Sequence, residues 1–231
     1  MRNGLYKVEA QSARGSDRGV IVARDGRIFG GNAAFAFGGH SRASGDGFAL
    51  ELSTLLRNGN PGYQPIAGIG SIALRGLSEG ERYRLEGSEP LLGGAFKAVL
   101  TGISEDAAPP ARGSAADGIA NGLYSLNIRM LDGIDAGNTG IMVLHDGSIR
   151  GGDAFFDYVG AYSSAQGRWK GELINHEHTP SRGERPVFGG HEVGIGFSGS
   201  YDDDGAEGEA TALAGKRSIR FKAVLRKLVA A

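Results

Sequence analysis

Several residue types and patterns are scarce or missing in this chain of 231 residues, and each absence narrows its class. Cysteine does not occur, so the fold cannot depend on disulfides, and metal sites built from thiolates are excluded. The first ten residues, MRNGLYKVEA, lack the apolar core of a signal peptide, and no later stretch approaches a membrane span of roughly 18 apolar residues. We therefore expect a soluble, cytoplasmic protein without a membrane segment.

Acidic and basic residues are nearly balanced in this chain. The formal net charge is −1 at pH 7, and the sequence contains no long basic run. Binding to nucleic acid depends heavily on clustered lysines and arginines that neutralise phosphates. Direct binding to DNA or RNA is therefore not expected.

Helical periodicity is scarce as well. Few stretches carry apolar residues at helical spacing for three turns, whereas the chain holds 41 glycines and only three methionines. Short strands joined by glycine-rich turns fit this composition better than helices do. The chain is predicted to be all-β.

One pattern in the sequence occurs twice. The stretch GVIVARDGRIFGGNAAFAFGGH at 19–40 aligns without a gap with the stretch that begins GIMVLHDGSIRGGDAFFDYVGAY at 140–162. In both, an Asp-Gly pair separates two apolar runs, which is the strongest short-range sign of a β-hairpin with a type I′ turn. The pentapeptide FKAVL also recurs unchanged at 96–100 and 221–225. The chain is therefore predicted to be a tandem duplication.

Each repeat carries about eight strand-like segments joined in sequence by short turns. This order favours an up-and-down antiparallel barrel, because closure removes the exposed edges of an open sheet; a sandwich is the alternative. Between the repeats, a segment rich in small residues and proline has no periodicity, as in many interdomain linkers. We expect a first barrel at 1–105, a linker at 106–120 and a second barrel at 121–231.

These motifs resemble the GrlR-like family of negative regulators of type III secretion. The shared features are an opening Asn-Gly-Leu-Tyr, a glycine-apolar strand before Asp-Gly, a Gly-Gly-Asp or Gly-Gly-Asn, an aromatic strand and a closing Phe-x-Ala-x-Leu strand. The resemblance covers each half separately and implies an eight-stranded, lipocalin-like barrel. It also implies pairing of barrels, and contact with a transcriptional activator through an acidic surface loop. In this chain the loop at that place reads SSAQG at 163–167 and SRASGD at 41–46.

Aromatic residues spaced two apart are predicted to point into the barrels. An eight-stranded barrel is either filled by its own side chains or holds one small molecule. The candidate ligand-binding residues are Tyr6, Phe37, Phe48, Tyr124, Tyr158 and Trp169. Ala10 in place of Met130, and Phe48 in place of Trp169, suggest more room in the first barrel.

Two polar clusters are candidate sites. His176 and His178 share one strand face, but no third metal ligand is evident nearby, so we expect a solvated pair and no metal site. Asp202, Asp203 and Asp204 lack the ligand spacing of a calcium loop and are predicted to form a charged hairpin tip, or a docking patch for a basic partner.

The sequence offers no nucleophile elbow and no phosphate-binding loop followed by a helix, so neither catalysis nor a cofactor is expected. Two functions remain open: a regulator that acts through protein contacts, as the resemblance implies, and a carrier of a small apolar, fatty-acid-like or lipid-like ligand. The fused repeats are also expected to form an intramolecular pseudo-dimer, with Val99 and Val224 as candidates for its contact.

Overall fold

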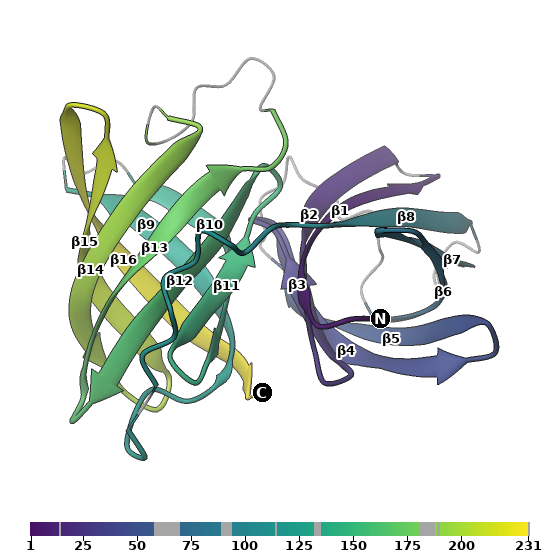
Figure 1. The fold of residues 1–231 in the computed structure, drawn as a ribbon, viewed down its shortest axis with the longest axis horizontal. Coiled ribbons are helices and arrows are strands. Elements are labelled where there is room, and N and C mark those ends of the chain that lie inside the picture. The colour runs from purple at the N-terminus through teal and green to yellow at the C-terminus, as the bar shows by residue number, and fades with distance from the viewer. Residues whose placement is uncertain are drawn as a thin grey trace. The chain divides into compact units, whose positions relative to one another are not determined.

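The computed structural model describes residues 1–13, 15–57, 70–88, 94–113, 115–131, 135–180, 188 and 190–230. The chain forms two compact units, Met1–Ser104 and Glu105–Ala231. Each unit contains one closed barrel of eight antiparallel strands, and neighbouring strands in sequence are neighbours in the sheet (Figure 1). The prediction of two tandem eight-stranded all-β barrels is therefore confirmed.

The first barrel closes where its last strand pairs with its first, with Val8 opposite Leu100. Its strands are β1 (Gly4–Ser12), β2 (Gly15–Arg24), β3 (Arg27–Gly31), β4 (Phe35–Ser44), β5 (Gly47–Arg57), β6 (Ser71–Glu79), β7 (Arg82–Ser88) and β8 (Ala95–Gly102).

The second barrel closes in the same way, with Leu126 opposite Leu225. Its strands are β9 (Gly122–Met130), β10 (Asp135–His145), β11 (Ser148–Gly152), β12 (Phe156–Ala165), β13 (Arg168–Glu177), β14 (Glu192–Tyr201), β15 (Gly205–Ala214) and β16 (Arg217–Ala230).

The repeated motifs form the same local structure in both barrels. At the β2–β3 turn, Asp25 and Gly26 have φ values of 49° and 79°, as a type I′ turn requires. Asn3 brackets this turn, because its side-chain Nδ2 donates to Asp25 Oδ1 at 2.9 Å and its side-chain Oδ1 accepts from Asp25 N at 2.8 Å. Asn121 makes the same two bonds to Asp146 in the second barrel. The opening Asn and the Asp-Gly pair recur together because they hold one turn.

Alternation along the strands separates a core face from a water face. On β8, for example, Phe96, Ala98 and Leu100 are buried, while Lys97 and Val99 between them are exposed. Val224, the counterpart of Val99, is half-buried on the outer face of β16. The described residues contain no helix of the length and apolarity that crossing a membrane requires.

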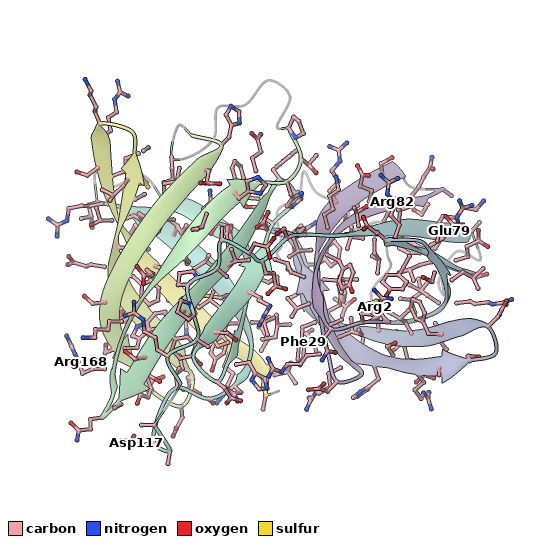
Figure 2. The ribbon with its side chains drawn as sticks, in the orientation of Figure 1. Arg2, Phe29, Glu79, Arg82, Asp117 and Arg168 are labelled. Atoms are coloured by element: carbon pink, nitrogen blue, oxygen red, sulfur yellow. The ribbon has the colours of Figure 1, made fainter. Side chains whose placement is uncertain are left out.

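One end of each barrel is capped by the residues that precede its first strand. In the first barrel the Tyr6 hydroxyl donates to the Arg2 carbonyl at 2.9 Å, and Arg2 N donates to the Tyr83 hydroxyl at 3.2 Å. Figure 2 shows Arg2 inside the outline of this barrel. In the second barrel the Tyr124 hydroxyl donates to the Ala120 carbonyl at 2.6 Å. We call this the capped end, and the opposite end the mouth.

The segment at 106–120, expected to be a linker, packs against the second barrel. Ile119 is 3% exposed and belongs to the apolar core of that barrel, and its backbone N–H donates to Ser164 Oγ at 3.0 Å. Asp117, labelled in Figure 2, accepts hydrogen bonds from the Tyr201 hydroxyl and from Gln166 N. Within the second unit this segment is therefore part of the fold.

Candidate ligand sites in the barrel interiors

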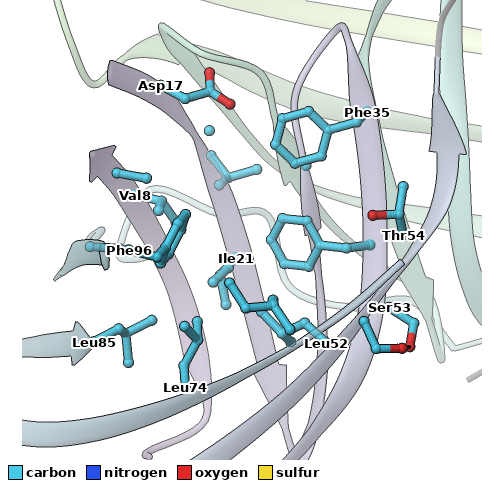
Figure 3. A pocket seen from close by; sticks show the side chains of 18 of the residues that line it. Val8, Asp17, Ile21, Phe35, Leu52, Ser53, Thr54, Leu74, Leu85 and Phe96 are labelled. Carbon is cyan, nitrogen blue, oxygen red and sulfur yellow. Dashed lines mark hydrogen bonds between the residues drawn. The ribbon is translucent and has the colours of Figure 1, made fainter. Parts of the chain in front are cut away.

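The first barrel encloses a cavity between its core and its mouth. Its volume is about 70 Å³. Apolar side chains make up most of its wall, and Figure 3 shows Leu74 and Leu85 at one end of it and Asp17 and Phe35 at the other. The inward-facing apolar members of the wall are Val8, Ala10, Ile21, Phe35, Phe37, Leu52, Ile72, Leu74, Leu85, Phe96 and Ala98.

Two aromatic rings form one side of this cavity near the mouth. Phe35 and Phe37 stand two apart on β4 and stack with ring centroids 5.9 Å apart and an interplanar angle of 29°. Gly30 lies opposite Phe37 on β3, and a Cβ placed there would be 2.5 Å from Cζ of the Phe37 ring. The glycine therefore makes the room that the ring occupies.

A buried carboxylate lies at the mouth of the same cavity. Asp17 is 7% exposed, and its Oδ1 accepts hydrogen bonds from Arg18 N at 2.7 Å and from the Asn32 side-chain amide at 3.1 Å. Asn32 is itself fixed, because its Oδ1 accepts from the backbone N–H groups of Ala34 and Phe35. Asp17 is thus held in place by the turn that carries the aromatic pair.

The second barrel has a smaller interior cavity, of about 50 Å³ by the same measure. Trp169 lines it and packs against Phe197 with centroids 4.5 Å apart, and the indole N–H donates to the Glu207 carbonyl at 3.0 Å. Phe188 closes over the cavity and packs on Phe221 at 5.1 Å. Larger side chains leave less space here than in the first barrel.

A tyrosine and a carboxylate bind each other at the mouth of the second barrel. The Tyr158 hydroxyl donates to Asp153 Oδ2 at 2.9 Å, and Asp153 Oδ1 accepts from Phe155 N and Phe156 N. Burial raises the pKa of Asp153, although these hydrogen bonds act in the opposite direction. Burial and the nearby carboxylate charge raise the pKa of Tyr158 well above its ordinary value. The Asp153 carboxylate is therefore hydrogen-bonded to groups of its own barrel.

The predicted interior residues divide into two groups. Phe37, Tyr158 and Trp169 line the cavities. Tyr6 and Phe48 instead pack on Tyr83 at the capped end, with centroids at 5.7 Å and 5.3 Å. Tyr124 lies at the capped end of the second barrel, where burial, with a smaller contribution from Tyr162, raises its pKa to about 12.

The expected difference in interior volume has a partly different cause from the one the sequence suggested. In the first barrel, Ala10 lies opposite Ala98 of the FKAVL strand. In the second barrel, the counterpart of Ala98 is Ala223, and the residue opposite it is Ile128. Ala10 therefore corresponds to Ile128, and the pairing with Met130 was wrong by two residues, which is one step of the strand's alternation.

The histidine pair does not converge on a common point. His176 Nδ1 lies 3.0 Å from Asp157 Oδ1, whereas His178 Nδ1 lies 2.9 Å from Thr179 Oγ1. Burial raises the pKa of Asp157, and the contact with His176 partly offsets this. Among the described residues, no group of three histidine or carboxylate side chains is arranged to hold a metal ion.

The three aspartates at 202–204 form the turn between β14 and β15. Asp202 Oδ1 accepts from Asp204 N at 2.9 Å and from Gly205 N at 3.0 Å, and all three aspartates are exposed. The Lys227 side chain donates to the Asp203 carbonyl. Asp202 thus stabilises the turn by accepting hydrogen bonds from its backbone, while Asp203 and Asp204 are exposed to solvent.

Sequence reasoning missed Asp17 as an interior residue. The signal was present, because Asp17, Gly19 and Ile21 alternate along one strand, and Ile21 is a core residue. An aspartate at the start of an apolar strand is ordinarily interpreted as a solvated strand end. Here the aspartate is buried, and the Asn32 side-chain amide, which follows strand β3, donates a hydrogen bond to it.

Comparisons with known proteins assign no family to this chain. No protein-family model matches the chain, and no curated protein matches it. One similar solved structure is the crystal structure of a "putative outer membrane protein" from Bacteroides fragilis, with a TM-score of 0.27 and 10% sequence identity. That alignment covers 98% of this chain and 97% of the other.

Proposed function

We propose that this protein is a non-enzymatic binding protein whose first barrel holds a small apolar molecule. The observation that carries the proposal is the cavity in the first barrel, which is walled mainly by aliphatic and aromatic side chains. Apolar cavities stay dry and take up apolar guests, because transfer of such a guest out of water is favourable.

The size of the cavity limits the ligand. A cavity needs about 10–15 Å³ of volume for each water-sized group, so about 70 Å³ accommodates roughly five to seven such groups. A five-carbon chain fits this range. At about 0.8 kcal/mol per buried CH₂, such a chain gains about 4 kcal/mol, which corresponds to a Kd of about 1 mM.

Titration with 1-pentanol, followed by ligand-observed NMR on the full chain, tests the proposal. We expect saturable binding in the millimolar range by the wild-type protein. Ala10→Ile, which introduces the residue of the second barrel into the wall of the first, should abolish most of it. Native mass spectrometry of the purified protein, searching for a co-purified small molecule, would identify the natural ligand class.

The matched control is Ala73→Ile, because Ala73 is exposed on the outer face of β6 and the same atoms are added there. This variant should bind pentanol as the wild type does. If wild type and Ala10→Ile bind alike, or if neither binds, the first barrel is not a ligand site.

A second candidate function is regulation through protein contacts. The three exposed carboxylates at Asp202, Asp203 and Asp204, of which Asp202 fixes the turn, support a docking patch for a basic partner such as a transcriptional activator. Replacing Asp203 and Asp204 by Lys leaves the turn bonds of Asp202 in place. If this is the docking patch, a partner co-purified with the wild type should be lost from this double variant and retained by Glu209→Lys, which reverses another exposed charge in the same barrel.

A further inference from the structure

One polar side chain lines the cavity of the second barrel without a hydrogen bond to any described part of the chain. This side chain is Asn175 on β13, and it is 4% exposed. We propose that the second barrel binds a small neutral carboxamide, whose amide group pairs with the Asn175 amide and whose alkyl group fills the apolar part of the cavity. This site is separate from the ligand site of the first barrel and does not depend on it.

Asn175 faces the interior of the second barrel. Along β13 it shares its face with Trp169 and Leu173, which line the same cavity. It lies directly opposite Tyr158 on β12 and Val193 on β14, and both of these neighbours are buried. The alternation of side chains along a strand therefore points this amide into the barrel.

The other two hydrogen-bonding side chains of the described wall have partners within the barrel. The Tyr158 hydroxyl donates to Asp153 Oδ2 at 2.9 Å. The Trp169 indole N–H donates to the Glu207 carbonyl at 3.0 Å. The Asn175 amide, with two N–H donors and one carbonyl acceptor, has no such bond within the described ranges. A buried amide without a hydrogen bond is destabilising, so a guest that satisfies both its donor and its acceptor is favoured.

The wall of this cavity carries no formal charge in the part of the chain that the structure describes. Apart from Asn175, its residues are aliphatic, aromatic or glycine. An ion that entered would lose its water without gaining an opposite charge, which is costly. A neutral carboxamide, by contrast, carries a donor and an acceptor side by side and can exchange two hydrogen bonds with the Asn175 amide. The site therefore favours a neutral amide over an acid or an amine.

The volume of the cavity limits the ligand to a few atoms. About 50 Å³ accommodates roughly three to five water-sized groups, at about 10–15 Å³ for each. Propanamide lies at the upper end of this range. The apolar surface available to its ethyl group includes two pairs of packed rings, Trp169 with Phe197 and Phe188 with Phe221.

The first repeat has a different group at this place. Thr54 lies opposite Phe37 in the first barrel, as Asn175 lies opposite Tyr158 in the second. Thr54 also lines its cavity, but a hydroxyl has a single donor and cannot form the paired bonds of an amide. The preference for a carboxamide is therefore expected of the second barrel alone.

The test compares propanamide with butanone and propanoate, two probes of nearly the same shape, on the full chain at neutral pH. Butanone has a methyl group in place of the amino group, and propanoate has a charged oxygen there. The indole N–H signal in NMR spectra of ¹⁵N-labelled protein reports binding, because Trp169 is the sole tryptophan and lines this cavity. We expect saturable binding of propanamide by the wild type, and binding of propanoate that is weaker by about 10-fold or more.

Asn175→Leu removes the amide and keeps a branched side chain of similar shape. In this variant the ratio of the butanone Kd to the propanamide Kd should fall by about 10-fold, the size of one to two neutral hydrogen bonds. The ratio cancels changes in cavity shape that affect both probes alike. Asn175→Thr, which introduces the residue of the first repeat, should lower the ratio as well and replaces the leucine variant if that one fails to fold.

Asn127→Leu is the matched control. Asn127 stands between Leu126 and Ile128 on β9, and these two line the cavity, so its side chain lies on the outer face of the same barrel. The same chemical change there should leave the ratio of the two Kd values as it is in the wild type.

Two results would overturn the carboxamide site. One is the absence of a saturable shift of the Trp169 signal with propanamide. The other is a Kd ratio that is equal in the wild type and in every folded Asn175 variant. Either result would mean that the Asn175 amide is hydrogen-bonded to water only. Because the Trp169 signal reports on the second barrel, either result would leave the ligand site of the first barrel standing.

Discussion

Filling the first cavity with the residue that the second barrel uses should stabilise the first barrel. Ala10 faces the interior on β1, lines the cavity and is only partly buried, whereas Ile128 occupies the equivalent place in the smaller cavity. The perturbation is Ala10→Ile, which adds three carbons to the wall of the cavity.

Two estimates of the gain agree. At about 24 cal/mol for each Å³ of cavity, a cavity of about 70 Å³ costs about 1.7 kcal/mol of unfolding free energy. Burial of three further carbons at about 0.8 kcal/mol each gives an upper limit of about 2.4 kcal/mol. Asp17 lies directly opposite Ala10 on β2, so part of the gain is lost to crowding and desolvation of that carboxylate. We expect a net gain of about 1–2 kcal/mol.

Differential scanning calorimetry and far-UV circular dichroism would measure this gain. For a unit of 104 residues, 1 kcal/mol raises Tm by about 4 °C, so the transition of the first barrel should rise by about 4–8 °C. The sole tryptophan, Trp169, belongs to the second barrel, so the fluorescence transition should not move. Tryptophan fluorescence therefore serves as an internal control in every scan.

The control variant separates cavity filling from strand propensity. Isoleucine is favoured in strands wherever it stands, so Ala73→Ile on the outer face of β6 should raise Tm by much less. If Ala10→Ile gains no more than Ala73→Ile, or lowers Tm, the interior space is not available to a side chain. A ligand in that space would then be excluded as well.

Three further predictions concern other parts of the barrels. Burial raises the pKa of Asp153 above the ordinary 3.8, so the free-energy penalty on its charged form is fully present at neutral pH and shrinks as pH falls through the folded-state pKa. Asp153→Asn should therefore stabilise the second barrel more at pH 7 than at pH 4 in urea unfolding, and a stability difference that does not change with pH would refute this. The pKa of Tyr124 is raised to about 12, so ultraviolet titration should show a phenol that ionises late and disappears in Tyr124→Phe; a titration curve identical in both proteins would contradict it. A Cβ at Gly30 would lie 2.5 Å from the Phe37 ring and 2.6 Å from a backbone oxygen, so Gly30→Ala should lower the unfolding free energy by about 1–3 kcal/mol or more. In thermal unfolding Gly196→Ala, whose Cβ meets nothing within 4 Å, should be nearly neutral, and equal effects of the two variants would show that the wall is not tightly packed.

The duplication has kept the scaffold and changed the interiors. The bracketed Asp-Gly turn and the tyrosine bond at the capped end recur in both barrels. At the mouth, the first barrel has Asp17 hydrogen-bonded to Asn32, while the second has Asp153 hydrogen-bonded to Tyr158.

The sequence by itself determined the class, the duplication and the strand order. Period-two alternation, as in Phe96, Ala98 and Leu100, identifies a core face because successive side chains of a strand point to opposite sides. The Asp-Gly pair at 25–26 identifies a tight hairpin, because few residues tolerate positive φ twice in succession. These signals depend on neighbours within a few residues, and therefore they can be read locally.

The tertiary structure alone decided which of these residues surround a cavity. Phe37 and Phe48 have the same pattern in sequence, yet one lines the cavity near the mouth and the other fills the capped end. The burial of Asp17 depends on Asn32, 15 residues away, and that of Ile119 on a serine 45 residues away. Such burial arises from where a closed sheet brings distant segments together, and no local periodicity encodes the position of a side chain along the barrel axis.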